Sequence, residues 1–156
     1  MGTRSRIAIR NADNTYISIY CHWDGYPSHV GALLIKHYAT EEKARELLAL
    51  GNLSSLRENI GQKHKFNSGQ GRDNRWTTAY SRDRGEADQE AEEHADLDAL
   101  KAAAQNSGAE WVYIFTPAGW QCAPGGFSAF GAPATEQADG FEAVDYWIQR
   151  EAHDND

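Results

Sequence analysis

Long hydrophobic runs are missing from this sequence, and cysteine is scarce. No apolar run approaches the roughly eighteen residues that a membrane span needs. The first residues lead directly into a strand pattern, without an apolar segment of the length typical of a signal peptide. Because Cys21 and Cys122 are the only cysteines, we expect two reduced thiols in a cytoplasmic protein rather than a disulfide framework.

Positive charge is also in deficit. The net charge of −8 opposes non-specific binding of nucleic acid, which needs a positive surface. The charge is uneven, however: residues 57–84 hold seven lysines and arginines against three acidic residues, and residues 86–98 are strongly acidic. A cationic segment inside an acidic protein favours a small anionic ligand over a polymer.

The sequence has neither a phosphate-binding loop nor a compact metal-binding motif. The glycine-containing segments 69–71 and 124–126 lack the spacing, the lysine and the strand-to-helix context of phosphate loops. His22, Asp24 and His29 are chemically suitable metal ligands, but they lack a tight spacing such as His-Glu-x-x-His. Ordinary hydrogen-bonded histidines are the favoured interpretation. We therefore expect no metal site and no cofactor.

The hydrophobic patterns predict both strands and helices. Helical spacing predicts a buried stripe at Val30, Leu33, Leu34, His37 and Tyr38. The expected elements are strands 6–10 and 16–21, helices 27–38 and 40–50, strand 75–81, helix 96–106, strands 110–115 and 120–123, and helix 139–151. This order, β-β-α-α-β-α-β-β-α, predicts one α+β domain over residues 1–156, with a mostly antiparallel sheet of about five strands and helices packed on one face. A long polar loop is expected over 61–74, and a solvated loop or frayed helix over 85–95.

The densest cluster of reactive side chains is the segment 19–29, at the predicted junction of a strand and a helix. Loops at such junctions present side chains and backbone N–H groups to ligands. Cys21 and His22 cannot form a catalytic dyad, because neighbours on a strand point to opposite faces. Cys21 continues the apolar face of Ile17 and Ile19, which favours a buried thiol. The exposed candidates that remain are His22, Trp23, Asp24 and Tyr26.

A second candidate segment, residues 80–86, follows the strand predicted over 75–81. If that strand continued, Arg82 and Arg84 would share one face. Arginine forks match phosphate oxygens, and aromatic faces stack on nucleobases. A solvated surface network of arginine and aspartate is the alternative interpretation. The residues that we predict to bind a ligand, with no catalytic residue among them, are His22, Trp23, Asp24, Tyr26, His29, Tyr80, Arg82 and Arg84.

Three parts of the chain together resemble small proteins encoded by phages and prophages: residues 19–31 (IYCHWDGYPSHVG), the pair His37-Tyr38, and residues 80–86 (YSRDRGE). The similarity covers most of residues 5–115. Small accessory phage proteins often look like counter-defence factors, and one class of these, the sponges, sequesters nucleotide immune messengers such as cyclic dinucleotides and ADP-ribose derivatives. A sponge needs a pocket of aromatics and arginines and no catalytic group. By analogy, the resemblance implies a non-enzymatic binder of a small anionic nucleotide in the cytoplasm of an infected bacterial host.

Two other functions fit the same residues. A small nucleotide hydrolase or phosphodiesterase would use His22, Asp24 and His29. An acidic protein inhibitor of a host defence factor would act through the segment 86–98, which contains Glu90, Glu92 and Glu93. A homodimer would be unsurprising, although no heptad repeat or exposed apolar stripe indicates one. The relation in space between residues 22–29 and 80–86 separates these hypotheses best.

Overall fold

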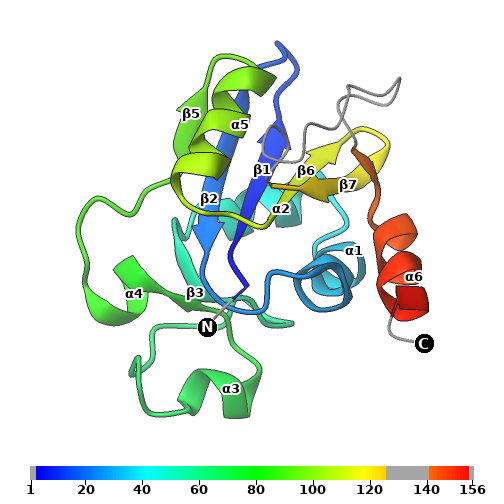
Figure 1. The fold of residues 1–156 in the computed structure, drawn as a ribbon. Coiled ribbons are helices and arrows are strands. Elements are labelled where there is room, and N and C mark those ends of the chain that lie inside the picture. The colour runs from blue at the N-terminus through cyan, green and yellow to red at the C-terminus, as the bar shows by residue number, and fades with distance from the viewer. Residues whose placement is uncertain (1–2, 126–140, 155–156) are drawn as a thin grey trace.

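The computed structural model describes residues 3–125 and 141–154, with side chains described up to Glu151. It is a mixed α+β structure (Figure 1). The strands are β1 (Ser5–Arg10), β2 (Tyr16–Cys21), β3 (Leu53–Ser55), β4 (Thr78–Ala79), β5 (Glu92–His94), β6 (Trp111–Thr116), β7 (Gly119–Pro124) and β8 (Glu142–Ala143). The helices are the π-helical turn η1 (Pro27–Gly31), α1 (Ala32–His37), α2 (Glu41–Leu48), α3 (Gln70–Asn74), α4 (Tyr80–Arg84), α5 (Leu97–Asn106) and α6 (Val144–Asp154). No helix in the described ranges is both long and apolar enough to span a membrane.

The described strands form one mixed sheet in the order β4-β3-β2-β1-β6-β7-β8, with β5 paired beside β2. The prediction of a mostly antiparallel sheet of about five strands was wrong in two respects. The sheet has eight strands, and the pairs β1–β6 and β2–β3 are parallel. The strands that were missed have two or three residues each, which is too short for an alternating pattern to appear. Two parallel strands need a long connection that returns the chain to the same end of the sheet. Such connections, which contain helices, lie between β1 and β6 and between β2 and β3.

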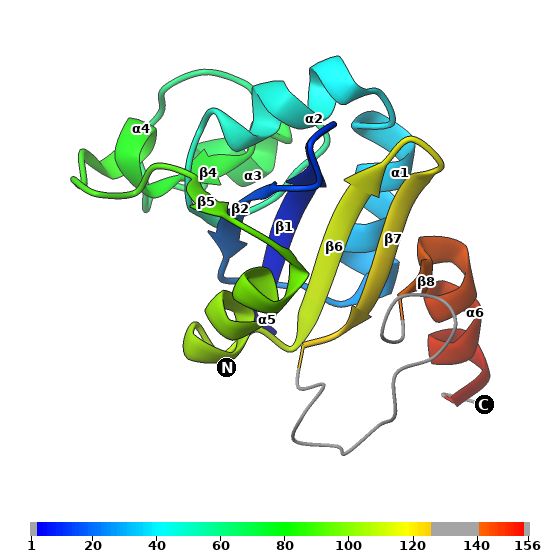
Figure 2. The ribbon, with the colours of Figure 1, turned by 90° about the horizontal axis from the view of Figure 1, so that it is seen from above.

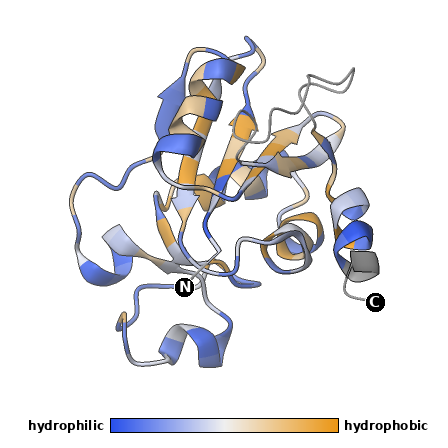
Figure 3. Ribbon diagram, in the orientation of Figure 1, coloured by the Kyte–Doolittle hydropathy of each residue, from blue (hydrophilic) through white to orange (hydrophobic). Residues whose placement is uncertain are grey.

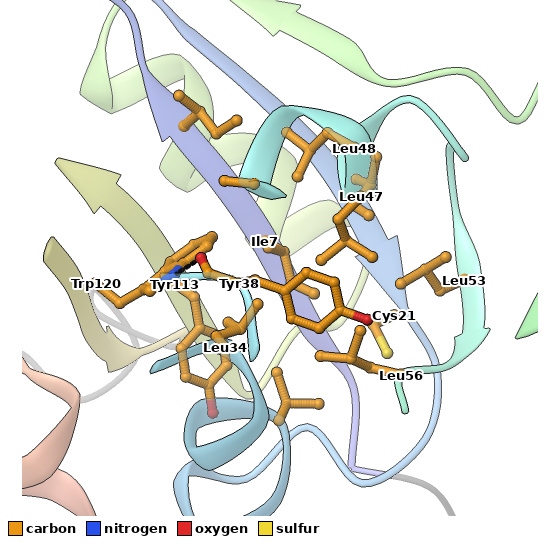
Figure 4. Packing of buried hydrophobic residues seen from close by; sticks show 14 of the residues in the cluster. Ile7, Cys21, Leu34, Tyr38, Leu47, Leu48, Leu53, Leu56, Tyr113 and Trp120 are labelled. Carbon is orange, nitrogen blue, oxygen red and sulfur yellow. Dashed lines mark hydrogen bonds between the residues drawn. The ribbon is translucent and has the colours of Figure 1, made fainter. Parts of the chain in front are cut away.

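Helices cover both faces of the sheet rather than the single face that was expected (Figure 2). One face packs Ile7, Ile19 and Cys21 of β1 and β2 against leucines of α1 and α2. The labelled side chains of Figure 4 show this cluster. The other face packs Ala8 of β1 against Leu100 of α5. Successive residues of β1 therefore point into two different hydrophobic clusters, one on each face of the sheet. Figure 3 shows the hydrophobic residues of β1 and β6 in the middle of the sheet.

Several local predictions are confirmed. The chain forms hairpins at β1–β2 and β6–β7, and β6 lies between β1 and β7. Thr40 and Asp96 cap α2 and α5, because each side chain accepts a hydrogen bond from a backbone N–H three residues later. Cys21 and Cys122 are buried free thiols. The predicted start of the last helix at residue 139 lies outside the described residues.

The strand predicted over 75–81 is wrong at its end. Only Thr78 and Ala79 are in a strand, and α4 begins at Tyr80. The carboxylate of Asp83 accepts a hydrogen bond from the N–H of Ala79 at 2.8 Å, which satisfies a free donor at the helix start. The alternation that would have placed Arg82 and Arg84 on one face is therefore absent. The loops expected over 61–74 and 85–95 contain the short elements α3 and β5.

Candidate functional site

The structure brings residues 20–23 and 80–84 together across the end of the sheet. β3 joins them, because it pairs with both β2 and β4. Asn52, just before β3, accepts a hydrogen bond on its side-chain oxygen from the N–H of Tyr20 at 2.9 Å. Its backbone oxygen accepts another from the N–H of Tyr80 at 3.2 Å. The two candidate segments therefore share one anchor.

The β2 side of this site is a row of three rings. The hydroxyl of Tyr20 is hydrogen-bonded to Nδ1 of His22 at 2.7 Å, and the imidazole meets the Trp23 ring edge-on with centroids 4.8 Å apart. The N–H groups of His22 and Trp23 donate to the carbonyls of Leu53 and Ser54, which extends the β2–β3 pairing. Trp23 is 43% exposed, an unusual degree for so large an apolar side chain.

The α4 side is a stack of two rings and a guanidinium. The rings of Phe66 and Tyr80 are stacked at an interplanar angle of 30°, with centroids 5.7 Å apart. The guanidinium carbon of Arg84 lies 4.3 Å from the centre of the Phe66 ring and 5.1 Å from that of Tyr80. Such cation–π contacts hold an arginine in place while leaving its edge open to solvent. Nε of Arg84 also donates to Glu86 at 2.6 Å.

We call this set the aromatic–arginine surface; its residues are Tyr20, His22, Trp23, Phe66, Tyr80 and Arg84. Burial raises the pKa of Tyr80, an effect that Ser54 and Arg84 partly oppose. Burial likewise raises the pKa of Tyr20, with Arg4 acting in the opposite direction. Both phenols are therefore neutral hydrogen-bonding groups at physiological pH. Phe66 was not predicted, because an aromatic residue in a long polar loop gives no periodic signal.

Arg82 and Arg84 both belong to α4, but their side chains point in different directions and have different partners. Side chains two residues apart on a helix diverge by about 200°. The guanidinium of Arg82 donates to the carboxylate of Asp83 and to the carbonyls of Thr77 and Ile60, at distances between 2.7 and 3.2 Å. Only 18% of its side chain is exposed. Arg82 therefore holds the segment that carries Arg84, and we leave it out of the ligand-binding set below.

Asp83 and His64 form the centre of that buried network. Neither side chain has exposed surface. The carboxylate accepts hydrogen bonds from the N–H groups of His64 and Ala79, while the imidazole is bonded to Thr78 Oγ1 at 3.0 Å and to the Gln62 carbonyl at 2.8 Å. A buried charge needs this degree of pairing. The network ties the loop before α3 to α4, and no sequence pattern indicated it.

Asp24, Tyr26 and His29 form a separate group at the start of η1. The ring centroids of Tyr26 and His29 are 6.0 Å apart. Asp24 adopts the left-handed region with φ of 55°, and its carboxylate makes no hydrogen bond with the part of the chain that is described. Within the described ranges no hydrogen bond or ring contact links this group to the aromatic–arginine surface. The short segment after β2 joins the two groups along the chain.

The site does not assemble a metal centre from the described residues, among which no group of three histidine, cysteine or acidic side chains could hold an ion. His22 is paired with Tyr20 rather than with Asp24 or His29. Burial raises the pKa of Cys21 to about 12, so that its thiol is neither ionised nor accessible. Stacking and hydrogen bonding are thus the chemistry that the described geometry offers.

A second polar network, also missed by sequence analysis, docks the acidic segment onto the sheet. Only 5% of the Arg6 side chain, on β1, is exposed. Its Nε donates to Ser18 at 2.9 Å, and Nη2 to Glu92 at 3.0 Å. Ser18 is in turn bonded to His94 at 2.7 Å. Part of the predicted solvated segment is therefore a structural strand, β5.

Comparisons with known proteins identify no similar protein. The chain matches no family model, no curated protein and no solved structure. The chemistry of the aromatic–arginine surface therefore rests on its own residues and distances.

Proposed function

We propose that this protein binds a small phosphate-bearing nucleotide at the aromatic–arginine surface without cleaving it. One observation supports this most directly: Arg84 lies over Phe66 and Tyr80. Asn52 joins Tyr80 to Tyr20, in the segment that carries His22 and the exposed Trp23. Stacking of a nucleobase on an aromatic side chain is worth about 1–3 kcal/mol. An arginine fixed by ring contacts loses little further entropy when it grips a phosphate.

Each residue has a distinct role in this proposal. Trp23 stacks on the base, because it offers the most exposed ring. Arg84 binds phosphate, with Glu86 as the internal partner that the ligand displaces. His22 and Asp24 form hydrogen bonds to sugar or base, and Asp24 has a carboxylate without a hydrogen-bond partner in the described chain. Tyr26 and His29 extend the surface toward η1.

The biological role that we propose is that of a phage-type sponge. A sponge sequesters a nucleotide messenger of host defence in the cytoplasm of the infected bacterium, and it has to hold its ligand rather than turn it over. We assign no catalytic residue to this surface, in which Nδ1 of His22 is hydrogen-bonded to the Tyr20 hydroxyl.

Binding and release of intact ligand test the proposal. Purified protein is titrated with cyclic dinucleotides and ADP-ribose derivatives by calorimetry, then heated, and the released compound is identified by mass spectrometry. We expect one of them to bind and to be recovered unchanged. Trp23→Ala and Arg84→Gln should each weaken binding at least tenfold. Arg75→Gln is the matched control, because Arg75 is an exposed arginine that pairs with Glu58 elsewhere in the same cationic segment.

Other outcomes would favour the alternative functions. No binding of any nucleotide would overturn the proposal. Cleaved product that disappears in His22→Ala would indicate a hydrolase. Capture of one host protein, lost when Glu90, Glu92 and Glu93 become glutamine, would indicate an inhibitor that acts through the acidic segment; Glu92 also pairs with Arg6, so the folding of that variant has to be checked.

A further inference from the structure

A cavity of about 320 Å³ lies at the opposite end of the sheet from the aromatic–arginine surface. The turn between β1 and β2, the first half of α2 and the end of β6 enclose it, and Figure 2 shows α2 and the β6–β7 turn at this end. The lining residues that bear on its chemistry are Arg10, Asn11, Glu41, Arg45, Phe115 and Pro117. The volume falls within the range of small-molecule sites.

One arginine of the cavity is held in a fixed orientation. Arg45 donates from Nε to Glu41 at 2.8 Å and from Nη2 to the side-chain oxygen of Asn11 at 2.9 Å. Its remaining nitrogen, Nη1, makes no hydrogen bond within the described chain. A pair such as Glu41–Arg45, four residues apart on a helix, stabilises the helix without a third partner. The bond to Asn11 instead aims the guanidinium at the β1–β2 turn.

The second arginine, Arg10, is unpaired. Its guanidinium makes no hydrogen bond or ion pair with any described residue, although it lines the same cavity as Arg45. Glu41 is the one carboxylate among the lining residues, and Arg45 already engages it. The lining residues therefore include two guanidiniums and one carboxylate, and the carboxylate of Asp13, in the same turn, accepts hydrogen bonds from Thr15. An excess of guanidiniums over carboxylates in the lining attracts a compact anion.

An aromatic ring also lines the cavity. Phe115 is half-buried and meets Trp120 edge-on, with centroids 5.2 Å apart. Trp120 is itself fixed, because its indole N–H donates to the Tyr38 carbonyl at 2.8 Å. Pro117 continues the apolar wall. The cavity is thus lined by a flat apolar surface, by the guanidinium of Arg10 and by the guanidinium of Arg45, whose Nη1 has no hydrogen-bond partner in the described chain.

We propose that this cavity is a binding site for a small organic phosphate that carries a flat, unsaturated ring. The phosphate dianion is gripped by Arg10 and by Nη1 of Arg45, and the ring lies against Phe115 and Pro117. Planar guanidiniums on two elements match a phosphate with three terminal oxygens better than a single carboxylate. The site is separate from the one in the proposed function: the six residues of β2, about 17–20 Å in length, lie between them.

Phenyl phosphate is the probe that tests this site. Its titration into ¹⁵N-labelled protein should shift the backbone signals of Asn11 and Thr116 and leave that of Trp23 in place. Arg10→Gln and Arg45→Gln should each weaken binding at least tenfold, and Glu41→Gln should preserve or strengthen it because the opposing charge is removed. Arg75→Gln, which removes an exposed arginine outside both sites, should have no effect. Inorganic phosphate, which lacks the ring, should bind at least tenfold more weakly than phenyl phosphate.

Several results would overturn the inference. They are the absence of shifts at Asn11 and Thr116, unchanged affinity in Arg10→Gln, or equal affinity for inorganic and phenyl phosphate. Arg10 ends its strand and is exposed, so Arg10→Gln should fold normally, which a melting curve verifies. The two proposed sites can be tested separately. Arg10→Gln changes the cavity and not the aromatic–arginine surface, whereas Arg84→Gln changes the aromatic–arginine surface and not the cavity.

Discussion

The buried carboxylate of Asp83 accepts a hydrogen bond from the backbone N–H of His64 at 3.1 Å, and the two side chains have no exposed surface. This contact connects the loop before α3 with α4, and it explains how a segment without hydrophobic periodicity keeps a defined structure. Arg84 and Phe66, which belong to the proposed nucleotide site, lie on the two segments that it joins.

Asp83→Asn should strongly destabilise the protein. The amide replaces one acceptor with a donor, which then faces the N–H of His64 or of Ala79, and Arg82 loses its counter-charge. Breaking a buried pair of this type costs about 3–5 kcal/mol. Urea unfolding measures the change. Asp73→Asn is the control, since Asp73 is an exposed partner of Arg72 and should cost about 0.5 kcal/mol or less. Equal effects at both positions would contradict this account.

His94 should make the protein sensitive to mild acid. Burial, assisted by the charge of Arg6, lowers the pKa of its imidazole in the folded state. The unfolded chain, with a histidine pKa of about 6.5, then binds more protons, so the free energy of unfolding decreases as the pH falls below about 6.5. In His94→Gln, the difference in that free energy between about pH 7.5 and pH 5.5 should be smaller. An unchanged difference would show that His94 does not contribute.

Gly51→Ala should cost more stability than Gly85→Ala. Both glycines have a positive φ, 78° and 71°, so alanine is strained by about 1 kcal/mol at either position. At Gly51 the new methyl group would also collide with the carbonyl of Gln89, which accepts a hydrogen bond from Asn52. At Gly85 nothing lies within 4 Å. We expect about 1–3 kcal/mol of additional loss at Gly51 by urea unfolding.

The two thiols should be unreactive in the native protein. Burial raises the pKa of Cys21 to about 12, and it raises that of Cys122 further. Ellman's reagent at about pH 8 should therefore label neither thiol until urea unfolds the chain. Because the unfolded thiols ionise first, stability should also decline as the pH rises above about 8.5, by up to about 1.4 kcal/mol per pH unit for each thiol. Rapid labelling of folded protein would refute this prediction.

Phe66→Leu should separate binding from stability. Leucine preserves an apolar contact in this half-buried position but removes the ring under Arg84. We expect nucleotide affinity to fall about fivefold to tenfold, in line with a cation–π contribution of about 1 kcal/mol. The melting temperature should change by only a few degrees. If affinity is unchanged while Arg84→Gln abolishes binding, Phe66 does not position the guanidinium.

The sequence predicted the elements that have strong local signals. The hairpin around residues 11–14 follows from alternation and turn residues, and the caps at Thr40 and Asp96 follow from side chains that satisfy free N–H groups. Cys21 was placed in the core from the faces of a single strand. These inferences succeed because each depends on residues that are neighbours along the chain.

The predictions from the sequence were least accurate for residues whose conformation depends on a partner far away in the chain. The strand expected through Ser81 ends at Ala79, because Asp83 folds back to the N–H of that residue. Arg82 was predicted beside Arg84, yet its guanidinium turns toward the carbonyls of Thr77 and Ile60. Phe66 gave no signal at all, since its stack with Tyr80 depends on the path of a loop.

By itself, the sequence determined an α+β chain with a dense cluster of side chains after β2 and a cationic segment that ends in α4. Only the tertiary structure decided that these two regions meet through Asn52, that Arg84 is more exposed than Arg82, and that a cavity lined by two arginines lies at the far end of β2. The physical reason is that patterning along a chain records which faces are buried. Which distant groups satisfy a buried carboxylate or guanidinium is settled only when the strands pair and the loops pack.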